Sequence, residues 1–217
     1  MGDTEYYAAL LAAENAARLA ARAEAGEIEV TDLHPNAVRP YAWYLNGSPT
    51  GMFRSNIDRS DVPSDTAAIT SGTMLSVPVL LFAGDVVTNL TFASGATAAG
   101  TPTHWFFALY DTAATPALIG QSADQTTTAW AANTSKTLAL AAPYTVRATG
   151  WYRASVSVTA STVPTLSGIT VMTAASAGVV TGQIVLAQTS GSALGATAPA
   201  TIASPTTATQ VPYVVAT

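Results

Sequence analysis

The stretch HWFFALYDTAATPALIGQSADQ, which runs from residue 104 to residue 125, carries the strongest folding signal in the sequence. The side chains of its first seven residues would alternate between two sides, because successive side chains of a β-strand point to opposite faces. Both sides would then carry large apolar groups. One side would hold His104, Phe106, Ala108 and Tyr110, and the other would hold Trp105, Phe107 and Leu109. The stretch therefore predicts a strand with a large apolar surface.

The residues that follow predict a turn and a returning strand. Asp111 begins the segment DTAATPA, and LIGQSAD (118–124) supplies the second strand of a β-hairpin. His104, Asp111 and Asp124 then fall at strand ends or in loops, where polar side chains commonly hydrogen-bond to nearby backbone. We therefore interpret these three residues as scaffold and not as an active site.

Further strand-length runs with a period of two lie on both sides of this hairpin. They are TMLSVPVLLFAG (73–84), DVVTNLTFAS (85–94), KTLALAAPYTV (136–146), GWYRASVSVTA (150–160), GITVMTA (168–174) and GQIVLAQT (182–189). Short segments with Gly, Pro, Ser or Asn separate them, which is typical of an antiparallel sandwich or barrel. We predict a mainly β chain whose body, residues 73–217, is an antiparallel β-sandwich of jelly-roll-like type.

The run DVVTNLTF shows how one of these strands would place its side chains. Two alternating sets are predicted, of which one would be buried. The first set is Val86, Leu90 and Phe92, and the second is Val87, Asn89 and Thr91.

The C-terminal portion of the body carries no charge at all. From Ala154 to Thr217 no side chain is acidic or basic. Because so few charges are left to solvate this portion alone, we expect it to lie against neighbouring subunits.

Residues 1–26 predict an α-helix that needs a partner. Asp3 can cap its start, alanines with high helix propensity follow, and Gly26 ends it. A narrow seam with the 4-3-4-3 spacing of a coiled coil runs along it. The seam comprises Tyr6, Leu10, Ala13, Ala17 and Ala20. An isolated helix of this length is marginal in water, so we expect oligomerisation or anchoring, the alternative being a helix that packs on its own β domain.

Residues 27–72 predict an extended connector. Pro35, Pro40, Pro49 and Pro63 interrupt it. Its aromatic residues are too numerous for a disordered linker. We expect this segment to join the helix to the body while packing along the way.

Composition and charge exclude several functions. The 217 residues include 13 acidic and 8 basic side chains, for a net charge of −5 and no clustered basic surface that could bind nucleic acid. There is no cysteine for a disulfide or a thiolate metal site. No apolar run reaches the roughly 18 residues that span a bilayer. We expect no nucleic-acid partner, no membrane insertion and no cofactor.

Catalytic patterns are likewise absent from the sequence. It has no Gly-x-Ser-x-Gly turn, no His-x-His or His-x-x-x-His pair, and no phosphate-binding Gly-rich loop that ends in Lys-Ser or Lys-Thr. Three carboxylates of the body, Asp85, Asp111 and Asp124, all occur in turn-like contexts. We therefore predict a protein that is not an enzyme.

One stretch offers a candidate binding site. In DQTTTAWAANTSK (124–136), Trp130 is the only large apolar residue among polar ones. It could stack on a sugar ring, with Asn133 and Gln125 as hydrogen-bonding groups, because ligand sites combine aromatic and convergent polar side chains. The alternative is that Trp130 plugs the end of the sandwich. Trp105 and Trp151 lie inside strand patterns, and we expect both to pack in the core.

Residues 73–171 together resemble a known family. The strand AGDVVTNLTF, the aromatic strand ending in ALYD, the return LIGQSAD and the later strand GWYRASVSV resemble the β domain of minor tail or fibre proteins of phages that infect actinobacteria. The resemblance implies a virion structural protein, often a homotrimer, with its β body displayed outward. It departs from longer tail fibres, since neither a collagen-like repeat nor a long coiled-coil stalk is present.

Two functional classes follow from this resemblance. In the first class, the chain is a trimeric tail or short fibre protein that binds host-envelope glycans. In the second class, it is a capsid decoration or head-fibre protein that its N-terminal segment anchors to other virion proteins. We favour the tail over the head. A depolymerase, the third class, would need catalytic carboxylates such as Asp111 or Asp124.

Overall fold

The computed structural model describes residues 53–217, and these form three antiparallel sheets joined by turns and loops. The predicted helix of residues 1–26, its seam and the connector up to residue 52 lie outside the described residues. The prediction of a mainly β, antiparallel, sandwich-like body is confirmed. Strands rich in β-branched and aromatic residues form it because such side chains pack well on a pleated surface.

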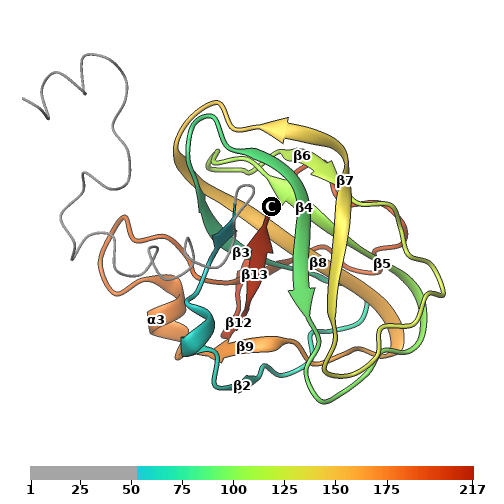
Figure 1. Cartoon of the computed structure of the whole chain (residues 1–217). Helices are drawn as coiled ribbons and strands as arrows, with labels where there is room; N and C mark the ends of the chain where they lie inside the picture. The colour runs from blue at the N-terminus through green and yellow to red at the C-terminus, as the bar shows by residue number, and fades with distance from the viewer. Residues whose placement is uncertain (1–52) are drawn as a thin grey trace, which may run out of the picture. The chain divides into compact units, whose positions relative to one another are not determined.

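The largest sheet has six strands and holds the hairpin predicted for residues 104–124 (Figure 1). Its order is β11 (Thr206–Thr207), β10 (Gln188–Ser190), β3 (Met74–Leu81), β8 (Gly150–Thr162), β5 (Gly100–Tyr110) and β6 (Leu118–Gln121). The predicted hairpin is confirmed, since β5 pairs with β6 in antiparallel register.

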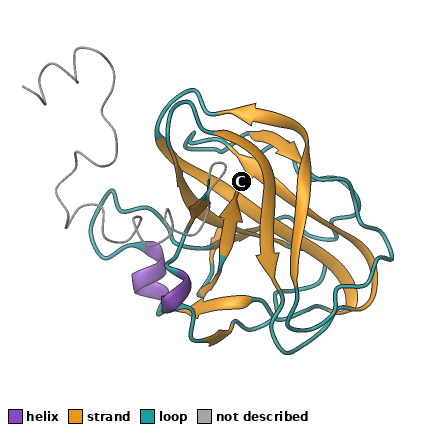
Figure 2. Cartoon of the chain, in the orientation of Figure 1, coloured by secondary structure: helices purple, strands orange, loops and turns teal. Residues whose placement is uncertain are grey.

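A four-stranded sheet and a three-stranded sheet complete the body. The four-stranded sheet has the order β1 (Arg54–Ser55), β13 (Val214–Ala216), β4 (Val86–Ala93) and β7 (Ser135–Thr145). The three-stranded sheet has the order β12 (Gln210–Pro212), β9 (Ser167–Thr170) and β2 (Ser64–Asp65). A 3-10 turn, η2 (Arg59–Asp61), and a short helix, α3 (Thr173–Ala177), lie in loops at the margin of the strands (Figure 2).

The main core fills the space between the six-stranded and the four-stranded sheets. Phe92 of β4 and Phe107 of β5 meet there with their ring centroids 4.7 Å apart. Trp105, Phe107 and Leu109 all belong to this core, as their shared face predicts.

The opposite face of β5 is buried as well. Phe106, Ala108 and Tyr110 form a second apolar cluster with Met74 and with residues of the C-terminal segment. Burial on both sides explains why the first strand of the hairpin is apolar without interruption, as in other strands that are covered on two faces.

The segment 191–205 provides this second cover. The Leu194 backbone N–H donates to the Gly72 carbonyl at 2.9 Å, and the Tyr110 hydroxyl donates to the Pro199 carbonyl at 2.8 Å. Ala198 and Ile202 are buried against the sheet. The uncharged C-terminal portion thus lies on the body of its own chain, where it contributes strands to all three sheets and covers apolar surface. Its contact with neighbouring subunits stays a prediction.

The boundary predicted at residue 73 is also corrected. β1 pairs with β13, and β2 pairs with β9, so the last part of the predicted connector contributes strands to the body. Among the described residues, the compact unit extends from residue 53 to Thr217. Strands of two residues carry no periodicity, which is why the sequence pattern did not reveal them.

A β-bulge changes the predicted alternation in β4. Val87, Leu90 and Phe92 are fully buried, whereas Val86 is exposed. The backbone N–H groups of residues 88 and 89 both donate to the Thr217 carbonyl, at 2.7 and 2.8 Å, and the register with β7 shifts at the same place. Two residues opposite one partner reverse the phase of the strand, so the prediction that Val86 shares a face with Leu90 was wrong.

Two predicted strands are shorter than their sequence runs. The run 168–174 forms only β9 before α3 begins at Thr173, and of the run 182–189 only its last two residues belong to β10. Residues 178–187 instead form a loop, and Gly182 and Ile184 of this loop line a cleft.

Candidate functional site

Trp130 lies in the core and not at the surface. Its side chain is fully buried, stacks on Trp105 with centroids 4.9 Å apart, and meets Phe107 edge-on at 5.6 Å. Its indole Nε1 donates to the Thr134 carbonyl at 3.2 Å. A ring enclosed in this way has no free face for a sugar, so the predicted stacking role of Trp130 is corrected and the alternative, a plug between the sheets, is what the structure contains.

The two predicted partners of Trp130 are engaged in the backbone of the same loop. The Gln125 amide donates to the Ala123 carbonyl at 3.0 Å, and the Gln125 backbone N–H donates to the Trp105 carbonyl. Asn133 is exposed and adopts a left-handed φ of 52° while its N–H donates to the Gly95 carbonyl. Without an open aromatic face beside them, these residues do not form the predicted glycan site.

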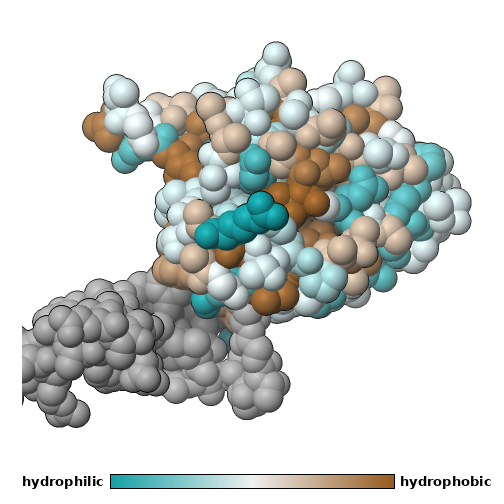
Figure 3. Space-filling view, turned by 90° about the horizontal axis from the view of Figure 1, so that it is seen from above, coloured by the Kyte–Doolittle hydropathy of each residue, from teal (hydrophilic) through white to brown (hydrophobic). Residues whose placement is uncertain are grey.

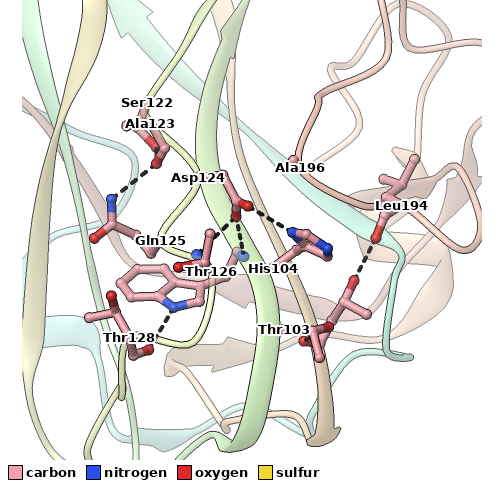
Figure 4. A network of polar contacts seen from close by, with 12 residues as sticks. Thr103, His104, Ser122, Ala123, Asp124, Gln125, Thr126, Thr128, Leu194 and Ala196 are labelled. Atoms are coloured by element: carbon pink, nitrogen blue, oxygen red, sulfur yellow. Dashed lines mark hydrogen bonds and ion pairs between the residues drawn. The ribbon is translucent and has the colours of Figure 1, made fainter.

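The His104–Asp124 pair is part of the same loop architecture (Figure 4). His104 Nδ1 lies 2.7 Å from Asp124 Oδ2, and Asp124 Oδ1 accepts hydrogen bonds from the backbone N–H groups of Trp105 and Thr126. The carboxylate therefore fixes the loop that follows β6. The interpretation of His104 and Asp124 as scaffold agrees with these contacts.

Other carboxylates of the body have comparable roles. Asp111 Oδ1 accepts from the N–H groups of Ala113 and Ala117 in the β5–β6 turn. Asp85 accepts from the Phe82 N–H and from Arg54, whose Nε and Nη2 contact both carboxylate oxygens at 2.9 and 2.8 Å.

A cleft of about 390 Å³ lies at one end of the six-stranded sheet. Its walls come from the β5–β6 turn, the start of β8, the loop that ends in β10, and Pro205 at the end of the covering segment. Its lining side chains include Asp111, Trp151, Arg153 and Gln188. The volume falls near the lower end of the range of small-molecule sites.

Arg153 is the most unusual group in this cleft. The residue is 9% exposed, its Nη1 donates to the Val185 carbonyl at 2.6 Å, and within residues 53–217 it forms no salt bridge. Burial lowers the pKa of the guanidinium from its ordinary value. Buried cations in proteins are normally paired, so this group has donor capacity that the fold leaves unused.

Gln188 has a similar surplus of polar capacity. It is 6% exposed, and its side-chain amide makes no hydrogen bond in the described part of the chain. An Asn or Gln amide offers two donors and an acceptor with two lone pairs. Two strongly buried polar side chains thus line the same cleft with few partners.

Trp151 is 44% exposed at the cleft, which corrects the expectation that it packs in the core. The sequence did contain a signal for this position. In GWYRASVSV the residues Tyr152, Ala154, Val156 and Val158 form the apolar face. Trp151 therefore shares a face with Arg153 two residues later, on the side of the strand opposite this apolar face.

The rest of the surface offers little concentrated charge. One face is shown in Figure 3, where residues of intermediate hydropathy predominate and apolar residues are gathered in patches between them. Large exposed apolar side chains include Met172, Val179 and Val180 next to α3.

Residues 53–217 contain no cluster of three or more His, Cys, Asp or Glu that could hold a metal ion. None of the helices formed by this part of the chain is long and apolar enough to span a bilayer.

No protein-family model matches the chain, and no curated protein matches it in sequence.

Proposed function

We propose that this chain is a non-enzymatic structural protein of a phage virion, a trimeric minor tail or short fibre protein that displays a jelly-roll-like β body. The proposal rests on the resemblance of residues 73–171 to the β domains of such proteins. This stretch supplies the strands β3 to β9, so the resemblance covers the central part of the body.

The observation that favours a structural role is the use of the body's charged groups. The carboxylates Asp85, Asp111 and Asp124 each accept backbone N–H hydrogen bonds in a turn or loop. Carboxylates bound in this way stabilise the turns of a rigid display module.

Immunogold labelling of intact virions tests the location. Antibodies against residues 73–217 would be applied to particles of the encoding phage, and denatured particles would be blotted with the same antibodies to establish that the chain is present. We expect label at the tail tip. Label over the head would instead establish the second class, a capsid decoration or head-fibre protein, and a chain absent from the blot would refute both virion assignments.

The oligomeric state is tested separately by light scattering of the purified full chain. A trimer of the 22.1-kDa chain would have a mass of about 66 kDa. Replacing Leu10 in the predicted seam by Asp should dissociate it to monomers, because a charge is not tolerated in a coiled-coil seam. A trimer unaffected by this change would refute the predicted helical seam but would leave the proposed location on the virion untouched.

A further inference from the structure

We infer that the cleft at the start of β8 binds an acidic saccharide, whose carboxylate pairs with Arg153 while its ring lies on Trp151. The inference deepens the proposed display function, on which its biological meaning rests. Binding is tested on the purified protein, so its failure would leave the virion location untouched.

The charge of the ligand follows from Arg153. The residue is 9% exposed, its guanidinium has a single hydrogen bond to a carbonyl, and it lacks a carboxylate partner within the described residues. A planar guanidinium presents donors in a fork that matches a carboxylate in a bidentate arrangement. An incoming carboxylate would therefore supply the counter-charge that the fold does not provide.

The shape of the ligand follows from Trp151. The residue is 44% exposed and lies two positions before Arg153, so both side chains emerge on the same face of β8. An exposed indole face beside polar groups favours a ring that is apolar on one side and polar at its rim, as in other small-molecule sites. A sugar ring has both properties.

The remaining polar groups suit hydroxyls better than further negative charge. The Gln188 amide has no hydrogen bond within the described part of the chain, and Asp111 uses Oδ1 for its turn and leaves Oδ2 unbound. Asp111 would repel a doubly charged phosphate, whereas it can accept hydrogen bonds from neutral hydroxyls. One cation beside one hydroxyl acceptor matches a singly charged uronate and not a nucleotide.

Isothermal titration calorimetry of the full-length protein would test the inference. The probe is a galacturonic acid trisaccharide, and the matched neutral probe is the corresponding galactose trisaccharide. Trp151→Ala and Arg153→Gln test the cleft, and Met172→Ala serves as the control because Met172 is 77% exposed and does not line the cleft.

We expect the acidic probe to bind and the neutral probe to bind at least about tenfold more weakly. Arg153→Gln should weaken binding at least about tenfold, since hydrogen bonds to a charged group are among the stronger ones. Trp151→Ala should weaken it by a similar factor, because the contact between the indole and the sugar ring is lost. Met172→Ala should not change it. If Arg153→Gln fails to fold, the exposed Trp151 variant and the neutral probe still decide the question.

Any of four results would overturn the inference. Equal affinity for the two probes would remove the role of the carboxylate, and acidic-probe binding that survives Trp151→Ala would place the site elsewhere. Absence of binding by the folded wild-type protein, or tighter binding of a nucleoside monophosphate, would refute the ligand class.

Discussion

Replacing Trp130 by alanine should remove a large part of the stability of the body. The indole is fully buried between Trp105 and Phe107, and its N–H has a carbonyl partner. Burying an aromatic side chain of about 250 Å² contributes about 6 kcal/mol at about 25 cal/mol per Å². Alanine retains part of this contribution, and measured losses for Trp→Ala in cores are about 3–5 kcal/mol. Since whole domains are stable by only about 5–15 kcal/mol, the variant should be close to unfolding at elevated temperature.

Urea unfolding followed by far-UV circular dichroism would measure this loss. Trp151→Ala is the matched control, because Trp151 is 44% exposed and the same substitution there should cost less than about 1 kcal/mol. Acrylamide quenching of the wild-type protein should also show a protected tryptophan. A loss below about 1 kcal/mol for Trp130→Ala, or equal losses for the two variants, would refute the assignment of Trp130 to the core.

Three further predictions concern backbone space, an ion pair and pH. Gly168→Ala should lower the free energy of unfolding by about 1–3 kcal/mol, because its new Cβ would lie 2.3 Å from a backbone carbonyl oxygen of β12. Gly120→Ala is the control and should be nearly neutral, because a Cβ there would have no atom within 4 Å. Equal urea midpoints for the two variants would contradict this prediction. Asp85→Asn should lower the free energy of unfolding by about 1–3 kcal/mol in urea titrations, since it weakens a bidentate contact with Arg54 in which both side chains are mostly buried. An unchanged urea midpoint would show that the ion pair contributes little to stability. Burial raises the pKa of the Tyr110 hydroxyl, so the folded state keeps its proton where the unfolded state, with an ordinary pKa near 10, loses it. Stability should therefore be retained below about pH 10 and fall above it. Tyr110→Phe should reduce this fall above about pH 10, whereas an identical pH dependence would exclude a contribution from this hydroxyl.

The local pattern of the sequence was sufficient for the hairpin and for most of the core. Large side chains that alternate along residues 104–110 permit a strand and little else, and Asp111 with its following residues permits a turn. These features depend on neighbours within a few residues. β3, β4, β5, β7 and β8 were found for the same reason, because each is long enough for its period to be visible.

Features that depend on distant partners were not predictable in this way. The bulge in β4 requires the Thr217 carbonyl, which lies 128 residues from Asn89 in the chain. The strands β1 and β2 have two residues each and exist only because β13 and β9 lie beside them. Such short strands have no intrinsic stability and no periodicity, and they form where a partner edge is already in place.

The candidate site illustrates the same division. The sequence alone determined that Trp151 and Arg153 share a face of one strand, since the period of a β-strand is two. Only the tertiary structure decided that this face is open at Trp151, that Gln188 lies in the same cleft, and that Trp130 is enclosed. The physical reason is that exposure is not a property of a strand but of what covers it, and here the cover is the uncharged segment 191–205, which ends at Pro205 beside the cleft and leaves that end of the sheet accessible.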